Sequence, residues 1–140
     1  MGIILCATRG GEAGYYTQDK AISLAKEHGD TLLFLYVVDL HFLDKTAAPI
    51  VVDVEDEITD MGEFILLMAK ERAAAQHVQA ESTCRKGKVR QEIKHVAQEE
   101  GVSLVVLGKP AGKESAFQMA ELEAFAKEIE AETGAETIIV

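Results

Sequence analysis

The sequence predicts an α/β domain in which a doubly wound, five-stranded parallel sheet, with strand order 3-2-1-4-5, carries helices on both faces. Two apolar segments, 31–39 and 102–108, do not alternate with polar residues, which is typical of strands covered on both faces. Segments with helical periodicity separate the apolar runs, so strands and helices alternate along the chain. This alternation implies parallel strands joined by right-handed crossovers, and the common doubly wound order places the first strand in the middle. The 140 residues suit one domain, 1–140.

The first three elements are expected to form a strand–helix–strand unit. The first strand is expected at 3–8, over the run IILCAT, and the second at 31–39. Between them a helix is expected at 17–29, because apolar residues recur on one face and Gly29 suits a C-cap. The residues on that face are Ala21, Ile22 and Ala25.

A second helix is expected at 57–77, after a longer connection, 40–56, that contains Pro49. Its apolar positions recur at helical spacing. We therefore expect Met61 and Met68 to lie in the core rather than on a functional methionine surface. The whole of this predicted face comprises Ile58, Met61, Ile65, Met68 and Arg72.

The rest of the chain repeats the alternation of strands and helices. Strands are expected at 78–85, 102–108 and 136–140, and helices at 88–100 and 115–134. In the predicted strand order, the second strand separates Cys6 from Cys84. Because adjacent strands lie about 4.8 Å apart, the two cysteines would be about 9.6 Å apart, too far for a disulfide.

The charge of the chain argues against nucleic-acid and membrane partners. The formal net charge is −10, which repels nucleic acid and anionic membranes. The one dense basic stretch, 85–90, is interpreted as a solvated strand end and helix start rather than an RNA site. The longest apolar run, 32–38, is too short to span a membrane, and no basic region precedes an apolar one at the N-terminus. We therefore expect a cytoplasmic protein.

Two glycine-containing turns are expected to meet at the edge of the sheet where ligands bind. One is ATRGGE, at 7–12, after the first strand; the other is GKPAGK, at 108–113, after the fourth. In the order 3-2-1-4-5 the winding reverses between these two strands, which is where open α/β sheets bind ligands. Backbone N–H groups and cationic side chains there would suit an anion. The alternative, that the glycines only make tight turns and the lysines are solvated, stays open. The candidate residues are Thr8, Arg9, Gly10, Gly11, Gly108, Lys109, Gly112 and Lys113.

Over nearly its full length the sequence resembles the universal stress protein family. The similar segments are the opening IILCATRGGE with LAKEHGDTLLFLYVVD, the middle IKHVAQEEGVSLVVLGK and the closing ETIIV. The resemblance implies the adenine nucleotide alpha hydrolase-like version of the doubly wound fold. It also implies that Val38, at the end of the second strand, occupies the position that contacts adenine.

The chain departs from the family's ATP-binding pattern at two places. Where ATP-binding members carry an Asp after the first strand, this sequence has Arg9, whose guanidinium donates hydrogen bonds but cannot accept them. The family's phosphate loop ends in a third glycine followed by Ser or Thr, and no glycine occurs here between Gly112 and Gly134. ATP held in the family's usual way is therefore not expected. A small anion, a differently posed nucleotide such as ATP or AMP, and no ligand at all stay open.

No motif in the sequence predicts catalysis. There is no nucleophile elbow, the four histidines show no metal-ligand spacing, and the acidic run 53–60 suits a helix start rather than a calcium loop. Acceptor carboxylates of a phosphate-receiver domain are absent after the first and third strands. We expect a stress-related regulatory or binding protein without catalytic residues or a metal site. A weak ATP hydrolase is the enzymatic alternative.

The C-terminal strand is expected to form an edge of the sheet and to pair with a second copy. Its last four residues, TIIV, are apolar and uncharged, and exposed edges of this kind pair with another chain. The resemblance also implies a homodimer through this strand, in addition to protein partners. The alternative is that the edge is too short and is covered by a neighbouring helix. The residues of the expected interface are Thr137, Ile138, Ile139 and Val140.

Overall fold

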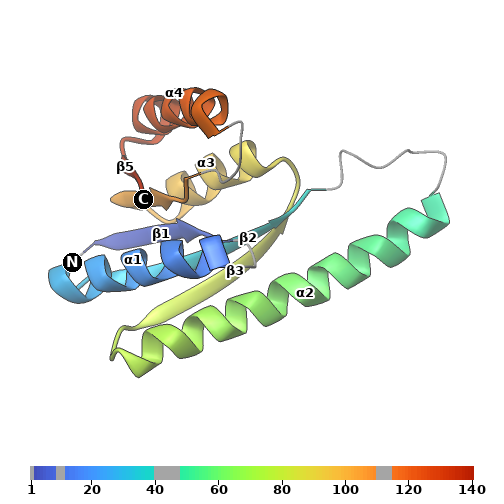
Figure 1. Ribbon diagram of the computed structural model, residues 1–140, viewed down its shortest axis with the longest axis horizontal. Helices are drawn as coiled ribbons and strands as arrows, with labels where there is room; N and C mark the ends of the chain where they lie inside the picture. Colours follow the sequence, from blue (N-terminus) through green and yellow to red (C-terminus); the bar gives the residue numbers. More distant parts are fainter. Residues whose placement is uncertain (1, 9–11, 40–47, 110–114) are drawn as a thin grey trace.

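The computed structural model describes residues 2–8, 12–39, 48–109 and 115–140, and these form a five-stranded parallel sheet with helices on both faces (Figure 1). The strand order is β3-β2-β1-β4-β5, which confirms the predicted order. The strands are β1 (Ile3–Ala7), β2 (Thr31–Val38), β3 (Ala80–Lys86), β4 (Leu104–Leu107) and β5 (Glu136–Ile139). The helices are α1 (Glu12–His28), α2 (Ala48–Ala75), α3 (Val89–Glu99) and α4 (Ser115–Thr133).

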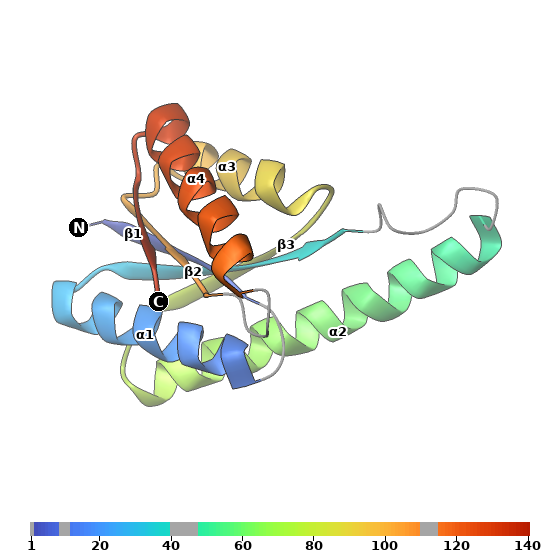
Figure 2. The ribbon, with the colours of Figure 1, turned by 45° about the horizontal axis from the view of Figure 1, so that its top comes forward.

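The sheet lies between two helical layers, each with its own core. Helices α1 and α2 cover one face and α3 and α4 cover the other, and the two views agree on this division (Figures 1 and 2). In β2, Leu32 and Phe34 face the α1–α2 core, whereas Leu33 and Leu35 face the α3–α4 core. Both faces of β2 are therefore apolar, which is why its sequence does not alternate.

Two helices begin earlier than the sequence predicted. Helix α1 begins at Glu12 rather than at residue 17, and α2 begins at Ala48 rather than at residue 57. Pro49 was assigned to the connection, but it lies in the first turn of α2. A proline is tolerated there because its missing N–H would have no partner within the helix.

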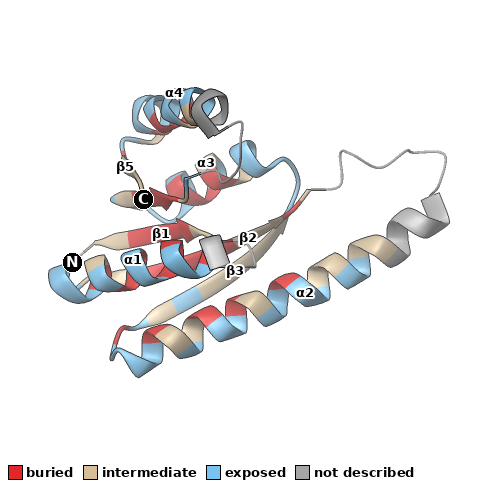
Figure 3. Ribbon diagram, in the orientation of Figure 1, coloured by how far each residue is buried: buried red, intermediate tan, exposed pale blue. Residues whose placement is uncertain are grey.

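The predicted buried face of α2 is wrong for its two methionines. Met61 and Met68 are exposed, whereas Ile58, Ile65 and Arg72 are partly buried. The buried residues of α2 lie on its side toward the sheet (Figure 3), and three of them are glycine or alanine. A Cβ atom on Gly62 would lie 2.3 Å from the ring of Tyr36, so the helix backbone lies directly against β2. Small side chains allow this close approach, whereas methionines at the contact would hold the helix away. The buried face comprises Gly62, Leu66, Ala69 and Ala73.

Strands β3 and β5 form the two edges of the sheet. The cations near the β3 end are paired with carboxylates: Arg85 with Glu99 at 2.6 Å, and Lys86 with Glu55 at 3.1 Å. At the other edge, β5 pairs only with β4 in the described part of the chain.

Both cysteines are free thiols. Cys6 lies in the central strand with no exposed surface, and burial raises its pKa to about 12. Cys84, in β3, is partly buried; burial and then the Glu63 carboxylate raise the pKa of its thiol. Both thiols are therefore protonated at neutral pH.

Candidate functional site

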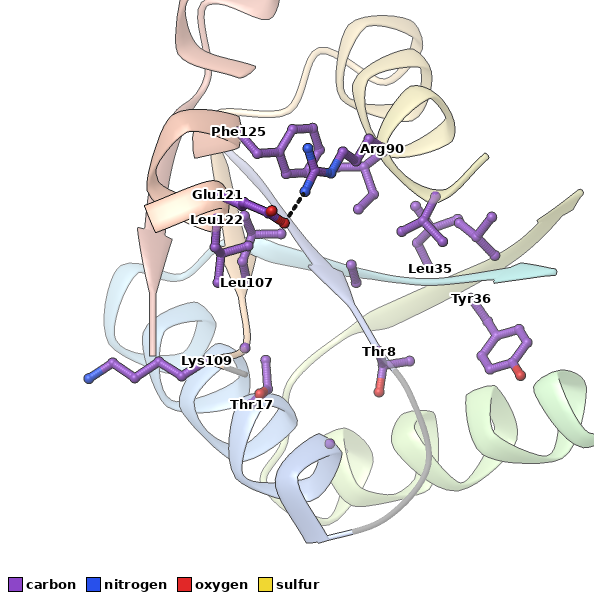
Figure 4. A pocket seen from close by; sticks show the side chains of 16 residues that line it. Thr8, Thr17, Leu35, Tyr36, Arg90, Leu107, Lys109, Glu121, Leu122 and Phe125 are labelled. Carbon is purple, nitrogen blue, oxygen red and sulfur yellow. Dashed lines mark ion pairs between the residues drawn. The ribbon is translucent and has the colours of Figure 1, made fainter. Parts of the chain in front are cut away.

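A cavity of about 560 Å³ opens at the carboxyl ends of β1, β2 and β4, where the sequence predicted a ligand site (Figure 4). Helices α1, α3 and α4 complete its walls. This is the edge where open α/β sheets bind ligands, and the volume lies in the range of small-molecule sites. The described lining residues are Ala7, Thr8, Gly14, Thr17, Leu35, Tyr36, Val37, Val89, Arg90, Ile93, Leu107, Gly108, Lys109, Glu121, Leu122 and Phe125.

A polar group lies where β1 meets α1. The Thr8 N–H donates to the Leu35 carbonyl at 2.8 Å, which holds the end of β1 against β2. Gln18 Nε2 donates to Thr8 Oγ1 at 2.7 Å, and both side chains are buried. This bond fixes the position of the Thr8 hydroxyl beside the cavity.

Close packing of α1 on the end of β4 forms another part of the wall. A Cβ atom on Gly108 would lie 2.5 Å from Thr17 Oγ1, and Thr17 is buried. Strand β5 holds this end of β4 from the other side. The Val140 N–H donates to the Leu107 carbonyl, and the Lys109 N–H donates to the Val140 carbonyl, each at 2.9 Å. Gly108 therefore sits in a backbone fixed on both sides.

The wall between α3 and α4 combines apolar surface with one ion pair. The Arg90 guanidinium points toward Glu121, 3.6 Å away, and lies 5.5 Å from the centre of the Phe125 ring (Figure 4). Both charged side chains are about half exposed, so solvent screens the pair. The arrangement places a guanidinium, a carboxylate and an aromatic ring on one side of the cavity.

Tyr36 connects the cavity to the other face of the sheet. It belongs to the lining, but its ring lies toward α2, against Gly62 (Figure 4). Burial, with a smaller effect from Cys84, raises the pKa of the Tyr36 hydroxyl. The phenol is therefore neutral at physiological pH.

The structure places some of the predicted ligand residues at the cavity. Thr8, Gly108 and Lys109 belong to its lining, and the Lys109 side chain extends away from the other labelled side chains (Figure 4). Val38 is buried outside the lining, and its carbonyl accepts the Gly87 N–H at 3.0 Å. The other candidates lie outside the described residues: Arg9, Gly10, Gly11, Gly112 and Lys113.

Several lining residues were not among the sequence candidates. Gly14 and Thr17 come from the early turns of α1, Arg90 from the start of α3, and Glu121 from the second turn of α4. A general rule could have identified them. Helices that follow the carboxyl ends of parallel strands begin at the ligand edge, so their first turns border the site.

The comparison with protein families decides what kind of chain this is. The model of the universal stress protein family matches residues 1–119. The chain belongs to the universal stress protein family. It is 33% identical to universal stress protein YxiE of Bacillus subtilis (strain 168), over 75% of this chain and 76% of that protein.

Solved universal stress proteins share the fold at lower identity. UspA from Lactobacillus plantarum has a TM-score of 0.81 and 18% identity, covering 99% of this chain and 97% of its own. A universal stress protein solved in complex with cAMP has a TM-score of 0.72 and 19% identity, covering 99% and 96%. The likeness confirms the universal stress protein fold. In the described part of the chain, no helix combines the length and apolarity needed to cross a membrane.

Proposed function

We propose that this universal stress protein is a regulatory module that binds an adenine nucleotide, and that it works as a homodimer without catalysing a reaction. The cavity at the strand ends carries the proposal. Its volume of about 560 Å³ far exceeds the need of an inorganic anion, and more of its wall is apolar than polar. Such a wall suits a flat purine better than a small anion.

The chemistry of the lining divides naturally between the parts of a nucleotide. Leu107, Ile93 and Phe125 offer apolar surface for the base, and the Thr8 and Thr17 hydroxyls are suited to a ribose. Lys109, which follows β4, is exposed and has a flexible side chain that can turn toward a phosphate. A relative of the same fold was solved in complex with cAMP, a nucleotide with one phosphate.

The sequence favours a nucleotide with few phosphates over ATP in the family's usual pose. Arg9 stands where the resemblance places an Asp, and the loop after β4 lacks the third glycine of the family's phosphate loop. Among the described lining residues the one carboxylate is that of Glu121, and it is paired with Arg90. We therefore favour binding over ATP hydrolysis, which requires an activated water.

The outer edge of β5, which pairs with no strand among the described residues, supports a homodimer. The N–H groups of Glu136 and Val140 point to β4, so those of Thr137 and Ile139 point outward in the strand's alternation. Such an edge is a template for a second strand.

The homodimer is tested at Thr137. Replacing Thr137 with Pro removes an outward N–H group without breaking a bond to β4, whereas Thr137→Val keeps that N–H group and is the matched control. We expect only the proline variant to sediment as a monomer in analytical ultracentrifugation.

The nucleotide proposal is tested on the purified wild-type protein. The protein is denatured, and released nucleotide is sought by absorbance and mass spectrometry; calorimetry then measures binding of AMP, cAMP and ATP. We expect AMP or cAMP to bind more tightly than ATP, and Lys109→Ala to weaken binding about tenfold by loss of a charge-assisted contact. Lys127→Ala, an exposed lysine on α4, is the charge-matched control. If nothing is released and millimolar nucleotide gives no heat, the proposal fails.

A further inference from the structure

The outer face of α2 exposes large apolar side chains in one cluster. Met61, Phe64, Leu67 and Met68 have 54%, 62%, 53% and 39% of their surface exposed. Over the described residues, these are four of the seven large apolar side chains with such exposure. We call these four residues the α2 patch. Single exposed apolar residues are ordinary on protein surfaces, but a cluster marks an interaction site.

The α2 patch is continuous because its members recur at helical spacing. Positions 61, 64 and 68 follow the i, i+3, i+7 pattern, and position 67 adjoins 64 on the same side. The opposite side of α2 packs on β2 and β3, so the patch cannot be part of that contact. Helix α2 runs along the outside of the molecule and extends past the sheet at its N-terminal end (Figures 1 and 2).

Acidic side chains stand at both ends of the α2 patch. Glu57 and Asp60 lie one turn before Met61 and Phe64, and Glu71 lies one turn after Leu67; all three carboxylates are exposed. Two cations lie nearby. Arg72 is engaged with α1, since it pairs with Asp19 and lies over the Tyr15 ring. Lys70 lies one turn after Leu67, beside Glu71. The patch therefore has an apolar centre, an acidic N-terminal end at Glu57 and Asp60, and both charges at its C-terminal end.

This charge distribution selects the kind of partner. A second copy of the chain also has net charge −10 and the same acidic residues Glu57 and Asp60, so like-charge repulsion opposes its approach to the patch. A helix with an apolar stripe and flanking Lys or Arg would complement both the apolar centre and the carboxylates. Methionines adapt their shape to a partner's side chains, and Phe64 supplies a rigid aromatic anchor.

We propose that the α2 patch is a docking surface for a basic amphipathic helix of a partner protein. Docking would lay the partner's apolar stripe along α2, with anchors at i, i+3, i+4 and i+7. The carboxylates of Glu57, Asp60 and Glu71 would receive the partner's cations. None of the four patch residues belongs to the lining of the strand-end cavity, so the proposal does not rest on nucleotide binding.

The test uses the full chain and a synthetic helical peptide of Leu and Lys whose leucines follow the i, i+3, i+4, i+7 pattern. A second peptide has the same composition in scrambled order, so it has the charge but no apolar stripe. Binding is measured by fluorescence anisotropy in 0.15 M salt, where weak unspecific attraction is screened. Circular dichroism confirms that each variant is folded.

Four variants separate the apolar and the charged contributions. Phe64→Ser removes the anchor, and Tyr16→Ser removes an exposed aromatic residue from α1 as its control. Asp60→Lys reverses a charge at the patch, and Glu123→Lys makes the same change at an exposed site on α4. We expect micromolar affinity for the patterned peptide, at least about tenfold weaker binding for Phe64→Ser and Asp60→Lys, and unchanged binding for the two controls.

Three outcomes would overturn the proposal. The scrambled peptide could bind as well as the patterned one, or Glu123→Lys could weaken binding as much as Asp60→Lys. Either result would mean that peptide binding depends on the net charge of the protein and not on the α2 patch. The patterned peptide could also fail to bind while Phe64→Ser changes the sedimentation of the wild type. That result would assign the α2 patch to a second copy of this chain.

Discussion

Replacing Gly108 with alanine probes the contact between β4 and α1 at the cavity wall. The new Cβ atom would lie 2.5 Å from Thr17 Oγ1, a distance that real Cβ atoms do not tolerate. Gly108 is not among the described glycines with positive φ, so alanine meets no backbone penalty there. The cost of Gly108→Ala therefore comes from overpacking alone.

The expected magnitude follows from two opposing effects. Overpacking a dense interior costs about 1–3 kcal/mol, and alanine recovers about 0.4–1 kcal/mol by restricting the unfolded chain. The net loss in free energy of unfolding should be about 1–2 kcal/mol. With an unfolding entropy of about 2.1 cal/mol/K for each of the 140 residues, this corresponds to a decrease in Tm of about 3–7 °C.

A double-mutant cycle identifies Thr17 as the obstacle. Thr17→Ala removes the atom at 2.5 Å and leaves only its Cβ, at 3.5 Å from the new methyl group. Thr17→Val keeps a group of similar size at the same place. In urea unfolding, Gly108→Ala should be neutral or slightly stabilising in the Thr17→Ala background and still costly in the Thr17→Val background. Equal costs in both backgrounds would refute the close contact.

Three further changes test other contacts. Gly62→Ala should lower the unfolding free energy although alanine favours helices by about 1 kcal/mol, because its methyl group would meet the Tyr36 ring; scanning calorimetry would contradict this if Tm rose. The hydrogen bond from Lys94 lowers the pKa of Glu128 below its usual 4.5, so that stabilisation is present above pH 4.5 and is lost as the pH falls through the lower folded value. As the pH is lowered below 4.5, the urea midpoint should therefore decrease more for the wild type than for Lys94→Met. Parallel curves of midpoint against pH would show that the Lys94–Glu128 pair does not contribute to stability. Thr8→Val leaves the buried Gln18 amide without its acceptor and should cost about 1–3 kcal/mol in urea unfolding, an expectation that an unchanged midpoint would disprove.

The sheet was predictable because its strands carry a strong and simple signal. Apolar residues on both faces of 31–38 favour a strand between two layers, and the alternation with helices then favours the common doubly wound topology. The helix starts were harder to locate. Pro49 suggests a loop by composition, yet it fits the first turn of α2, and propensity alone does not separate the two.

Side-chain size misled the prediction for α2. Hydrophobicity favours Met61 and Met68 as core residues over Gly62 and Ala69, but the distance between helix and sheet decides which face is buried. That distance depends on Tyr36, which lies far away in the sequence. The pair Arg90–Glu121 was missed for a similar reason, because α3 and α4 come together only in the folded chain.

The state of the two thiols makes the protein convenient for site-specific labelling. Cys6 has no exposed surface, and the pKa of the partly buried Cys84 thiol is raised, so neither offers an accessible thiolate near neutral pH. A new surface cysteine, such as that of Phe64→Cys, would therefore take up a maleimide dye much faster than the native thiols. A single fluorophore could then be placed on α2 or beside the cavity without first replacing the natural cysteines.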